Sequence, residues 1–334
     1  MDLDSLRSVF TDIVLTPWGL GILGLCVGSF LNVVIHRMPK MMEQQWQAEA
    51  RSVLGLPEGV QGGSTAQADK NDAAQGEAQT LTLSKPASRC PSCGHAIRWY
   101  ENIPVVSWLA LRGKCSACGT RISMRYPFIE LATAALFAAC AWRFGNQPTT
   151  LLWCGFVAAL VAASAIDWDT TILPDNITLP LLWAGLVIAG LGWNLPLSEA
   201  LWGAVAGYLS LWSVYWLFKI TTGKEGMGYG DFKLLAAIGA FLGWQMLPVV
   251  ILLSSLVGAG VGIAMIVFRS HGRNVPIPFG PYLAAAGVGK IGVVDGDVVS
   301  LSNLNRQVLF GEKDLRKNKA ETAVRSFQDK YSDI

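Results

Sequence analysis

The chain has 334 residues, of which 52% are hydrophobic and only 15% are charged, with a mean hydropathy of +0.39. A soluble globular protein carries roughly 25% charged residues, so this chain has too little charge to cover a water-facing surface of its size. Its formal net charge of +2 gives no reason to expect a nucleic-acid partner. The thirteen Trp and 35 Gly suit membrane helices and their interfaces. The composition therefore predicts a polytopic membrane protein whose surroundings are a lipid bilayer.

Seven apolar segments have a length compatible with a membrane helix, about 17–25 residues when flanking residues are counted. The first follows an acidic stretch and has no signal-peptide cleavage site after it, so we expect it to be retained. An eighth segment begins at Phe279 and stops after about ten residues. The seven segments are residues 17–35, 126–144, 151–166, 177–193, 201–218, 232–244 and 247–268.

Basic residues lie on one side of these segments. The loop 36–125 holds eleven Lys and Arg, the loop 219–233 holds three and the loop 269–273 holds two. Since cytoplasmic loops carry the excess of basic residues, we expect the N-terminus outside and these loops in the cytoplasm. This orientation puts Asp167 and Asp231 at the cytoplasmic ends of the third and sixth segments.

The large loop has two parts. Residues 43–84 are rich in Gln, Ala, Gly and Glu and are interpreted as a flexible insertion. Four cysteines follow as two C-x₂-C pairs, 21 residues apart, and a Gly follows each pair, as Gly94 and Gly119. Two such knuckles supply four thiolates for a tetrahedral Zn²⁺. The predicted ligands are Cys90, Cys93, Cys115 and Cys118.

Other uses of these cysteines are less favoured. A cytoplasmic loop is a reducing environment, so disulfides are not expected. A redox-active C-x-x-C would need a thioredoxin-like context that this sequence lacks. His95 could replace one cysteine ligand, although four thiolates make that unnecessary. Because so short a segment cannot bury enough apolar area alone, we expect the metal to fold it.

Asp167 and Asp231 are acids at the depth of the membrane edge, where a charged side chain is energetically costly and usually has a structural or functional role. Taken singly, Asp231 could cap the sixth helix, and Asp169 and Asp175 could be interfacial or cap the fourth. As a pair, Asp167 and Asp231 could share one proton and activate water. The glycines at positions 226, 228 and 230 would let the chain approach a neighbouring helix or an extended substrate closely.

The sequence Gly228-Tyr229-Gly230-Asp231 resembles the GxGD motif of intramembrane-type aspartic proteases. The wider pattern, over residues 10–287, resembles a bacterial type IV prepilin peptidase, the leader peptidase/N-methyltransferase of pili and type II secretion. Other matching stretches are 28–37, 101–108, 125–130, 173–175, 224–227 and 278–282, together with the cysteine quartet.

The resemblance implies Asp167 and Asp231 as the catalytic pair of a membrane aspartyl endopeptidase. It implies cleavage of the basic leader from prepilins and pseudopilins at the cytoplasmic face, followed by methylation of the new N-terminus with S-adenosylmethionine. It also implies the bacterial inner membrane as the location. No glycine-rich methyltransferase motif is visible, so the methyl transfer rests on the resemblance alone.

The residues after Gly287 have a different character, with many charges and no Trp. They resemble part of an E1-like adenylating enzyme, in which Asp295 would match a ribose-binding Asp, and Arg306 and Lys319 would match phosphate-contacting residues. The upstream glycine-rich loop is missing, and about 45 residues cannot build a Rossmann sheet. We interpret this segment as the product of a gene fusion or truncation that binds no ATP.

These observations predict an all-α polytopic membrane protein of about seven transmembrane helices and a truncated eighth, with a small cytoplasmic zinc-binding loop domain. The alternatives are a scaffold or transporter, whose acids would be expected near the midplane, and a nucleotide-dependent adenylase, which the missing phosphate loop opposes. The predicted divisions are 1–36 with the first helix, 37–125 as the zinc loop, 126–287 as the peptidase core and 288–334 as the E1-like fragment.

Overall fold

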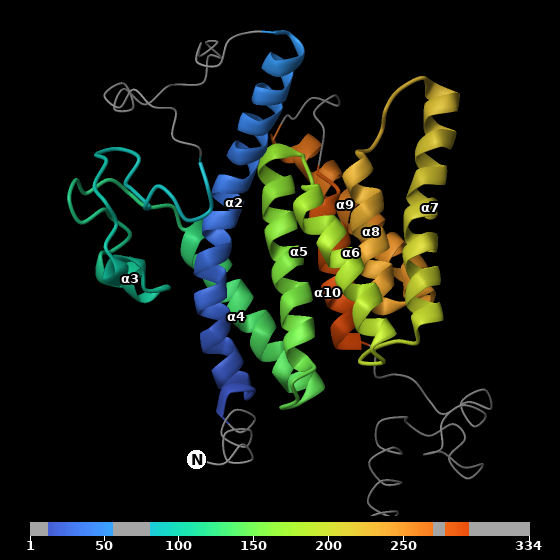
Figure 1. Cartoon of the computed structure of the whole chain (residues 1–334), viewed down its shortest axis with the longest axis horizontal. Helices are drawn as coiled ribbons and strands as arrows, with labels where there is room; N and C mark the ends of the chain where they lie inside the picture. The colour runs from blue at the N-terminus through green and yellow to red at the C-terminus, as the bar shows by residue number, and fades with distance from the viewer. Residues whose placement is uncertain (1–12, 56–80, 270–277, 294–334) are drawn as a thin grey trace, which may run out of the picture.

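The computed structural model describes residues 13–55, 81–269 and 278–293, and within these ranges it is helical without a β-strand. The helices of the bundle run alternately up and down (Figure 1). They are α2 (Pro17–Val53), α4 (Arg125–Phe144), α5 (Thr150–Thr170), α6 (Asp175–Gly190), α7 (Leu197–Thr222), α8 (Tyr229–Leu242), α9 (Leu247–Arg269) and α10 (Gly280–Val293). The helix order confirms the all-α membrane fold.

Five stretches within the described residues are long and apolar enough to cross a membrane. The helix α6 is apolar but shorter. The five stretches are Pro17–Val53, Arg125–Phe144, Thr150–Thr170, Leu197–Thr222 and Trp244–Met265. Each of the seven predicted segments falls on a helix, whereas the number of spans, seven or eight, stays a prediction.

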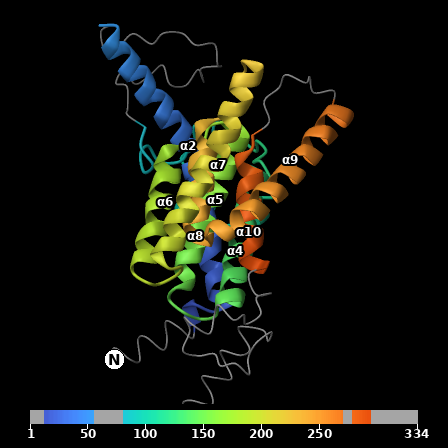
Figure 2. The ribbon, with the colours of Figure 1, turned by 90° about the vertical axis from the view of Figure 1, so that its right-hand side faces the viewer.

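The short helix α8 forms the centre of the bundle. Eleven of its residues, from Asp231 to Leu242 apart from Lys233, are buried, and it packs against α6, α7 and α10. Figure 2 shows α9 leaning away from α7 and α8 toward its upper end. A helix enclosed by other helices needs no lipid-facing surface, so α8 can be shorter than a full span.

Small residues let two pairs of helices approach closely. On α7, Gly203 and Gly207 lie against the backbone of α8 at Gly239 and Leu235, so an added Cβ at either position would collide with a carbonyl. On α2, Gly24 and Gly28 lie in the same way against α4. Pairs of small residues four positions apart are typical of membrane helix interfaces, where packing rather than hydrophobicity holds the helices together.

Two predicted boundaries differ from the structure. The helix α2 continues past Ile35 and through Pro39 to Val53, so the first part of the expected flexible insertion is helical, while residues 56–80 lie outside the described residues. The Gln, Glu and Ala that favoured flexibility are also good helix formers once a helix precedes them. The helix α10 likewise runs to Val293, past the change in composition at Gly287.

The zinc loop domain spans residues 81–124 and lies beside α2 and α4 (Figure 1). It contains two short helices, the 3-10 helix η3 (Trp99–Asn102) and α3 (Val106–Ala110). Arg37 of α2 is buried and donates to the carbonyl oxygens of Thr82, Leu83 and Pro86, so the first segment of this domain is held against the helix. The predicted domain boundaries themselves stay predictions.

Candidate active site and metal site

Asp167 stands in the last turn of α5 and is 4% exposed. The helix ends at Thr170, because Thr171 has a left-handed conformation, and the backbone N–H of Thr171 donates to the Asp167 carbonyl at 2.8 Å. The Pro at position 174 opposes a helical conformation at Leu173, so the chain turns here into α6. One carboxylate oxygen of Asp167, Oδ2, accepts a hydrogen bond of 2.9 Å from the backbone N–H of Gly280.

Asp231 is the third residue of α8 and is 7% exposed. Its Oδ1 has no hydrogen-bond partner within the ranges that the structure describes. Its carboxyl group interacts electrostatically with Asp167 and with the backbone N–H of Gly228, the residue before α8. The contact with Gly228 resembles a helix cap, so the capping interpretation and membership of a pair are compatible.

Leu173 and Gly280 bring the two aspartates together. A Cβ added at Gly230 would lie 2.6 Å from Cβ of Leu173, and one added at Gly280 would lie 2.8 Å from Oδ2 of Asp167 and 3.1 Å from Leu173. The sequence analysis included both residues in matching stretches without giving them a role. The available signal in the sequence was Gly280, which precedes Pro281 at the start of a helix. The predicted close approach therefore holds at Gly230, whereas Gly228 faces open space.

Each aspartate is followed two residues later by a charged residue that forms an ion pair to another helix. Asp169 pairs with Arg125 at the start of α4. Lys233 pairs with Asp175 at 2.7 Å, at the start of α6. The predicted alternative that Asp175 caps its own helix is wrong, since its carboxylate oxygens accept from Lys233 and Pro174 occupies the cap position.

The four cysteines of the zinc loop come from two knuckles with the same hydrogen bonds. The N–H of Gly94 donates to Cys90 O at 2.9 Å, and the N–H of Gly119 donates to Cys115 O at 3.0 Å. Both glycines have a left-handed φ, of 69° and 71°, which only glycine adopts easily. The repeated sequence pattern therefore folds into a repeated turn.

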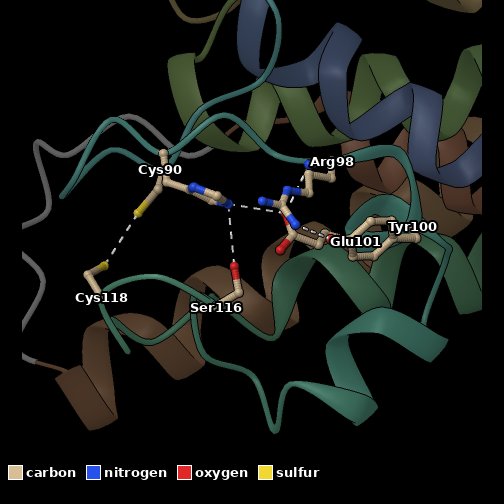
Figure 3. Close-up of polar contacts among 7 residues, drawn as sticks. Cys90, Arg98, Tyr100, Glu101, Ser116 and Cys118 are labelled. Atoms are coloured by element: carbon tan, nitrogen blue, oxygen red, sulfur yellow. Dashed lines mark hydrogen bonds and ion pairs between the residues drawn. The ribbon is translucent and has the colours of Figure 1, made fainter.

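The sulfur atoms of these turns converge. One ligand atom from each of Cys90, Cys93, Cys115 and Cys118 lies within 4.8 Å of the others. The Sγ atoms of Cys90 and Cys118 are 3.8 Å apart and face each other across the two loops (Figure 3). A tetrahedral zinc site with Zn–S bonds of about 2.3 Å has sulfurs roughly 3.8 Å apart. The donor set therefore fits a tetrahedral metal ion, and the four sulfurs leave no open coordination position.

The surroundings of two of the sulfurs favour thiolates, whereas burial and the neighbouring sulfurs raise the pKa of Cys93 to about 12. Hydrogen bonds from the backbone N–H groups of Cys93 and Ser92 lower the pKa of the Cys90 thiol. The hydroxyl and backbone N–H of Thr120 lower the pKa of Cys118 to about 6. Thiolates are the form in which cysteine binds a metal ion.

A polar cluster lies beside the quartet (Figure 3). Nε2 of His95 is 3.3 Å from Oε2 of Glu101 and 3.4 Å from Oγ of Ser116. The backbone N–H of Arg98 also donates to Glu101 at 2.9 Å. Since the imidazole faces Glu101 and Ser116, the structure gives His95 a place in linking the two knuckles, and the four cysteines suffice as ligands.

Glu130 joins the zinc loop domain to the membrane bundle, a contact that the sequence did not reveal. This carboxylate, in the second turn of α4, is 7% exposed and accepts a hydrogen bond of 2.7 Å from the backbone N–H of Val105. Val105 has φ 59° and ψ −47°, and the N–H of Val106 donates back to the Pro104 carbonyl. A positive φ at a β-branched residue is strained, and such strain persists only where the surroundings hold it.

Three family models match the chain. The bacterial peptidase A24 N-terminal domain matches residues 22–144, the type IV leader peptidase family matches residues 154–263, and the ThiF family matches residues 278–334. The first two cover the helices that carry Asp167 and Asp231 and the loop that carries the cysteines. The third begins within the described part of the chain, just before α10, and extends beyond it.

Curated relatives match most of the chain. A prepilin leader peptidase/N-methyltransferase of Stutzerimonas stutzeri is 52% identical over 288 residues, which is 85% of this chain and 92% of the relative. The protein of the same name from Pseudomonas aeruginosa is 55% identical over 80% of this chain and 86% of its own length. One from Aeromonas hydrophila is 53% identical over 79% of this chain and 86% of its own length. No solved structure matches the chain.

Proposed function

Because the chain belongs to the type IV leader peptidase family, we propose that Asp167 and Asp231 are the catalytic groups with which it cleaves the leader of prepilins. The observation that carries this assignment is the burial of two carboxyl groups, from α5 and α8, within electrostatic reach of each other at the same end of the bundle. Two adjacent carboxyl groups that cannot both ionise share one proton, which is the arrangement of an aspartic protease dyad.

The hydrogen bonds support a division of the two roles. Asp167 accepts a hydrogen bond from Gly280 N–H, which suits a carboxylate that takes a proton from the attacking water. The partnerless Oδ1 of Asp231 suits the carboxyl group that holds the shared proton and donates it to the scissile carbonyl oxygen. Water then adds to the carbonyl carbon, and collapse of the tetrahedral intermediate, with a proton to the leaving amine, breaks the peptide bond.

We propose that the dyad and the zinc loop face the cytoplasm of a bacterium, with the bundle in its inner membrane. The charge distribution of the loops supports this orientation, and the basic leader of a prepilin or pseudopilin would remain on the same side. A transporter would be expected to bury its acids near the midplane, whereas both aspartates lie near the ends of their helices.

The relatives are named N-methyltransferases as well, so we propose that this chain methylates the new N-terminus with S-adenosylmethionine as the methyl donor. The donor would supply a methyl group on a sulfonium ion. A groove of about 860 Å³ between α7 and α9 is lined by apolar side chains with two serines, Ser210 and Ser255, and offers no carboxylate to such a cation. We therefore assign the donor no residues.

We propose that the quartet binds zinc as a structural ion. A closed set of four thiolates leaves no position for water or substrate, so the ion would fold the loop domain and take no part in the hydrolysis. The E1-like fragment is proposed to have no role in either reaction, and Asp295, Arg306 and Lys319 lie outside the described residues.

The test is processing of a prepilin by the purified full chain in lipid vesicles, followed by mass spectrometry of the product. We expect the leader to be removed without S-adenosylmethionine and the new N-terminus to gain 14 Da only when it is present (about the mass of one CH₂). A preparation with one zinc per chain that leaves the prepilin intact would contradict the peptidase assignment.

A further inference from the structure

The zinc loop domain presents an exposed apolar edge, formed by Trp99, Ile103, Val106 and Leu109. These side chains are 83%, 40%, 60% and 62% exposed. They come from η3, α3 and the turn between them, and η3 and α3 contact each other. Exposed apolar side chains gathered in one short segment mark a surface that binds a partner or a membrane.

The orientation of α3 is fixed by Trp108, which contacts the rest of the zinc loop domain. Nε1 of Trp108 donates to the carbonyl of Ile122 at 3.3 Å, and its ring lies against Gly113, where an added Cβ would be 2.8 Å away. Trp108 therefore anchors α3 to the zinc loop domain, while Val106 and Leu109 on the same helix stay outside the packing.

The depth of this edge follows from Glu130. Glu130 is five residues after Arg125, which marks the charged end of α4 through its ion pair with Asp169. At a rise of about 1.5 Å per residue, Glu130 lies about 7.5 Å further along the helix axis. Its bond to Val105 holds the start of α3 near that level. Interfacial helices bury their apolar face about 5–10 Å into the membrane.

In Figure 1, α3 lies lower than the upper end of α5 and to the left of α2 and α4. On α4 itself, Tyr126, Phe128 and Leu131 are 43%, 71% and 53% exposed, as expected of side chains that face lipid. The bond from Val105 to Glu130 therefore holds the apolar edge near the level of these exposed side chains of α4.

The charges around the edge complement an anionic membrane surface. Residues 81–125 contain seven Lys and Arg (Lys85, Arg89, Arg98, Arg112, Lys114, Arg121 and Arg125) and one acid, Glu101. Arg98 directly precedes η3, and Arg112 follows α3 closely, so basic residues flank the apolar segment at both ends. Glu101 bonds to His95 and the Arg98 N–H. Basic residues beside an apolar face favour binding to anionic lipids.

From this depth, exposure and charge we propose that the apolar edge of the zinc loop domain inserts into the anionic leaflet of the bilayer beside α4. The membrane is favoured over a peptide as the occupant because Glu130 holds the edge near the level of the exposed apolar side chains of α4 and because basic residues flank the edge. The strained turn at Val105 and its bond to Glu130 then set the depth at which the domain is held. The proposal does not depend on which side chains cleave the prepilin.

The test uses the full chain in phosphatidylglycerol vesicles that contain a small fraction of a phospholipid with a diazirine in its acyl chain. After irradiation and digestion, mass spectrometry locates the labelled residues. We expect labels in the segment 99–109 as well as at Phe128, and none at Val53 and Leu54, which are 87% and 70% exposed at the far end of α2. Labelled Phe128 with an unlabelled segment 99–109 would overturn the proposal.

Matched variants sharpen the test. The double substitution Val106→Asp and Leu109→Asp should lower labelling of the segment at least fivefold, whereas Val53→Asp with Leu54→Asp should leave it unchanged. Zinc content reports whether each variant has kept its loop domain, and the labelling of the unchanged chain decides the question if the first variant does not fold. Loss of the lipid label on addition of a prepilin peptide would overturn the proposal in favour of a substrate-binding surface.

Discussion

The zinc loop domain and the membrane bundle assemble their polar groups over very different distances along the chain. Each knuckle closes its turn within a few residues, through Gly94 N–H to Cys90 O and Gly119 N–H to Cys115 O. The aspartates instead come from α5 and α8, and the hydrogen bond to Asp167 comes from Gly280, 113 residues away. Local substitutions should therefore break the metal site, whereas the dyad also depends on residues remote in sequence.

The two regions are also held together by different interactions. In the loop domain, four converging sulfurs and the metal ion that we propose they hold would replace an apolar core. In the bundle, close helix contacts at Gly203, Gly207 and Gly239 create a core in which α8 is almost fully buried, and the aspartates stand at its edge. The carboxyl groups gain their isolation from water through this packing, so packing is part of the catalytic arrangement that we propose.

The largest expected effect is the loss of a dyad carboxyl group. Asp167→Asn or Asp231→Asn should each lower prepilin cleavage by roughly 10²–10⁴-fold, because one carboxyl group cannot act as both acid and base. The rate of leader removal by purified protein measures this, with membrane insertion and zinc content unchanged. Asp169→Asn is the matched control, since it removes a charge two residues from Asp167. Normal processing by either dyad variant would sink the assignment.

The second-largest effect on cleavage is expected from a substitution at Gly280, which is far from Asp167 in sequence. Gly280→Ala would place a Cβ 2.8 Å from Asp167 Oδ2, so the carboxylate must move. Misplacement of a catalytic group by about 1 Å can cost roughly 10²-fold in rate, and we expect a fall in kcat of that order. Gly289→Ala, on the same helix with open space around it, is the control. Equal rates for the two variants would mean that Gly280 does not position Asp167.

Loss of a cysteine ligand should affect the zinc loop domain rather than the membrane bundle. Cys→Ser at any one of the four ligand positions should weaken metal binding by at least about tenfold. Methylation and substrate binding should suffer as much as cleavage, because the loop domain and not the dyad loses its fold. Metal analysis beside both activities measures this. Cys154→Ser, which changes a buried thiol of α5 within the bundle, is the control. Freshly purified protein without zinc would contradict the assignment.

The ion pair beside Asp231 should have a smaller effect. The side chains of Lys233 and Asp175 are 26% and 53% exposed, so their attraction is screened by water. Pairs of this kind contribute roughly 0.2–1 kcal/mol, and Asp175→Asn should lower kcat/KM no more than about fivefold. The difference from the unchanged enzyme should shrink as salt is added. A loss of kcat/KM as large as that caused by Asp231→Asn would indicate that Asp175 also takes part in catalysis.

Removal of residues 294–334 should have the smallest effect, since the cysteine quartet, Asp167, Asp231 and Gly280 all precede residue 294. We expect the chain shortened after Val293 to retain its cleavage rate within a factor of about two. Binding of ATP, measured by calorimetry on the full chain, should be absent. ATP binding that disappears on Arg306→Ala would instead establish the E1-like fragment as a working module.

The sequence by itself determined the membrane class, the helices and the four cysteines whose sulfurs the structure brings together. Apolar runs of membrane length specify helices because the backbone must satisfy its hydrogen bonds internally in lipid. The cysteine spacing and the two glycines specify knuckles because every interaction in them is local. The sequence also placed Asp167 and Asp231 at one end of the bundle, since successive helices run in opposite directions.

Only the tertiary structure decided which groups meet. The partners of Asp167, Asp175 and Glu130 are Gly280, Lys233 and Val105, each far away in sequence. The helical extension of α2 to Val53 also differs from its interpretation as a flexible segment. Such contacts depend on how whole helices pack, and a packed neighbour is absent from any local pattern. The proposed depth of the apolar edge follows from one of them, because the hydrogen bond from Val105 to Glu130 holds the start of α3 beside α4.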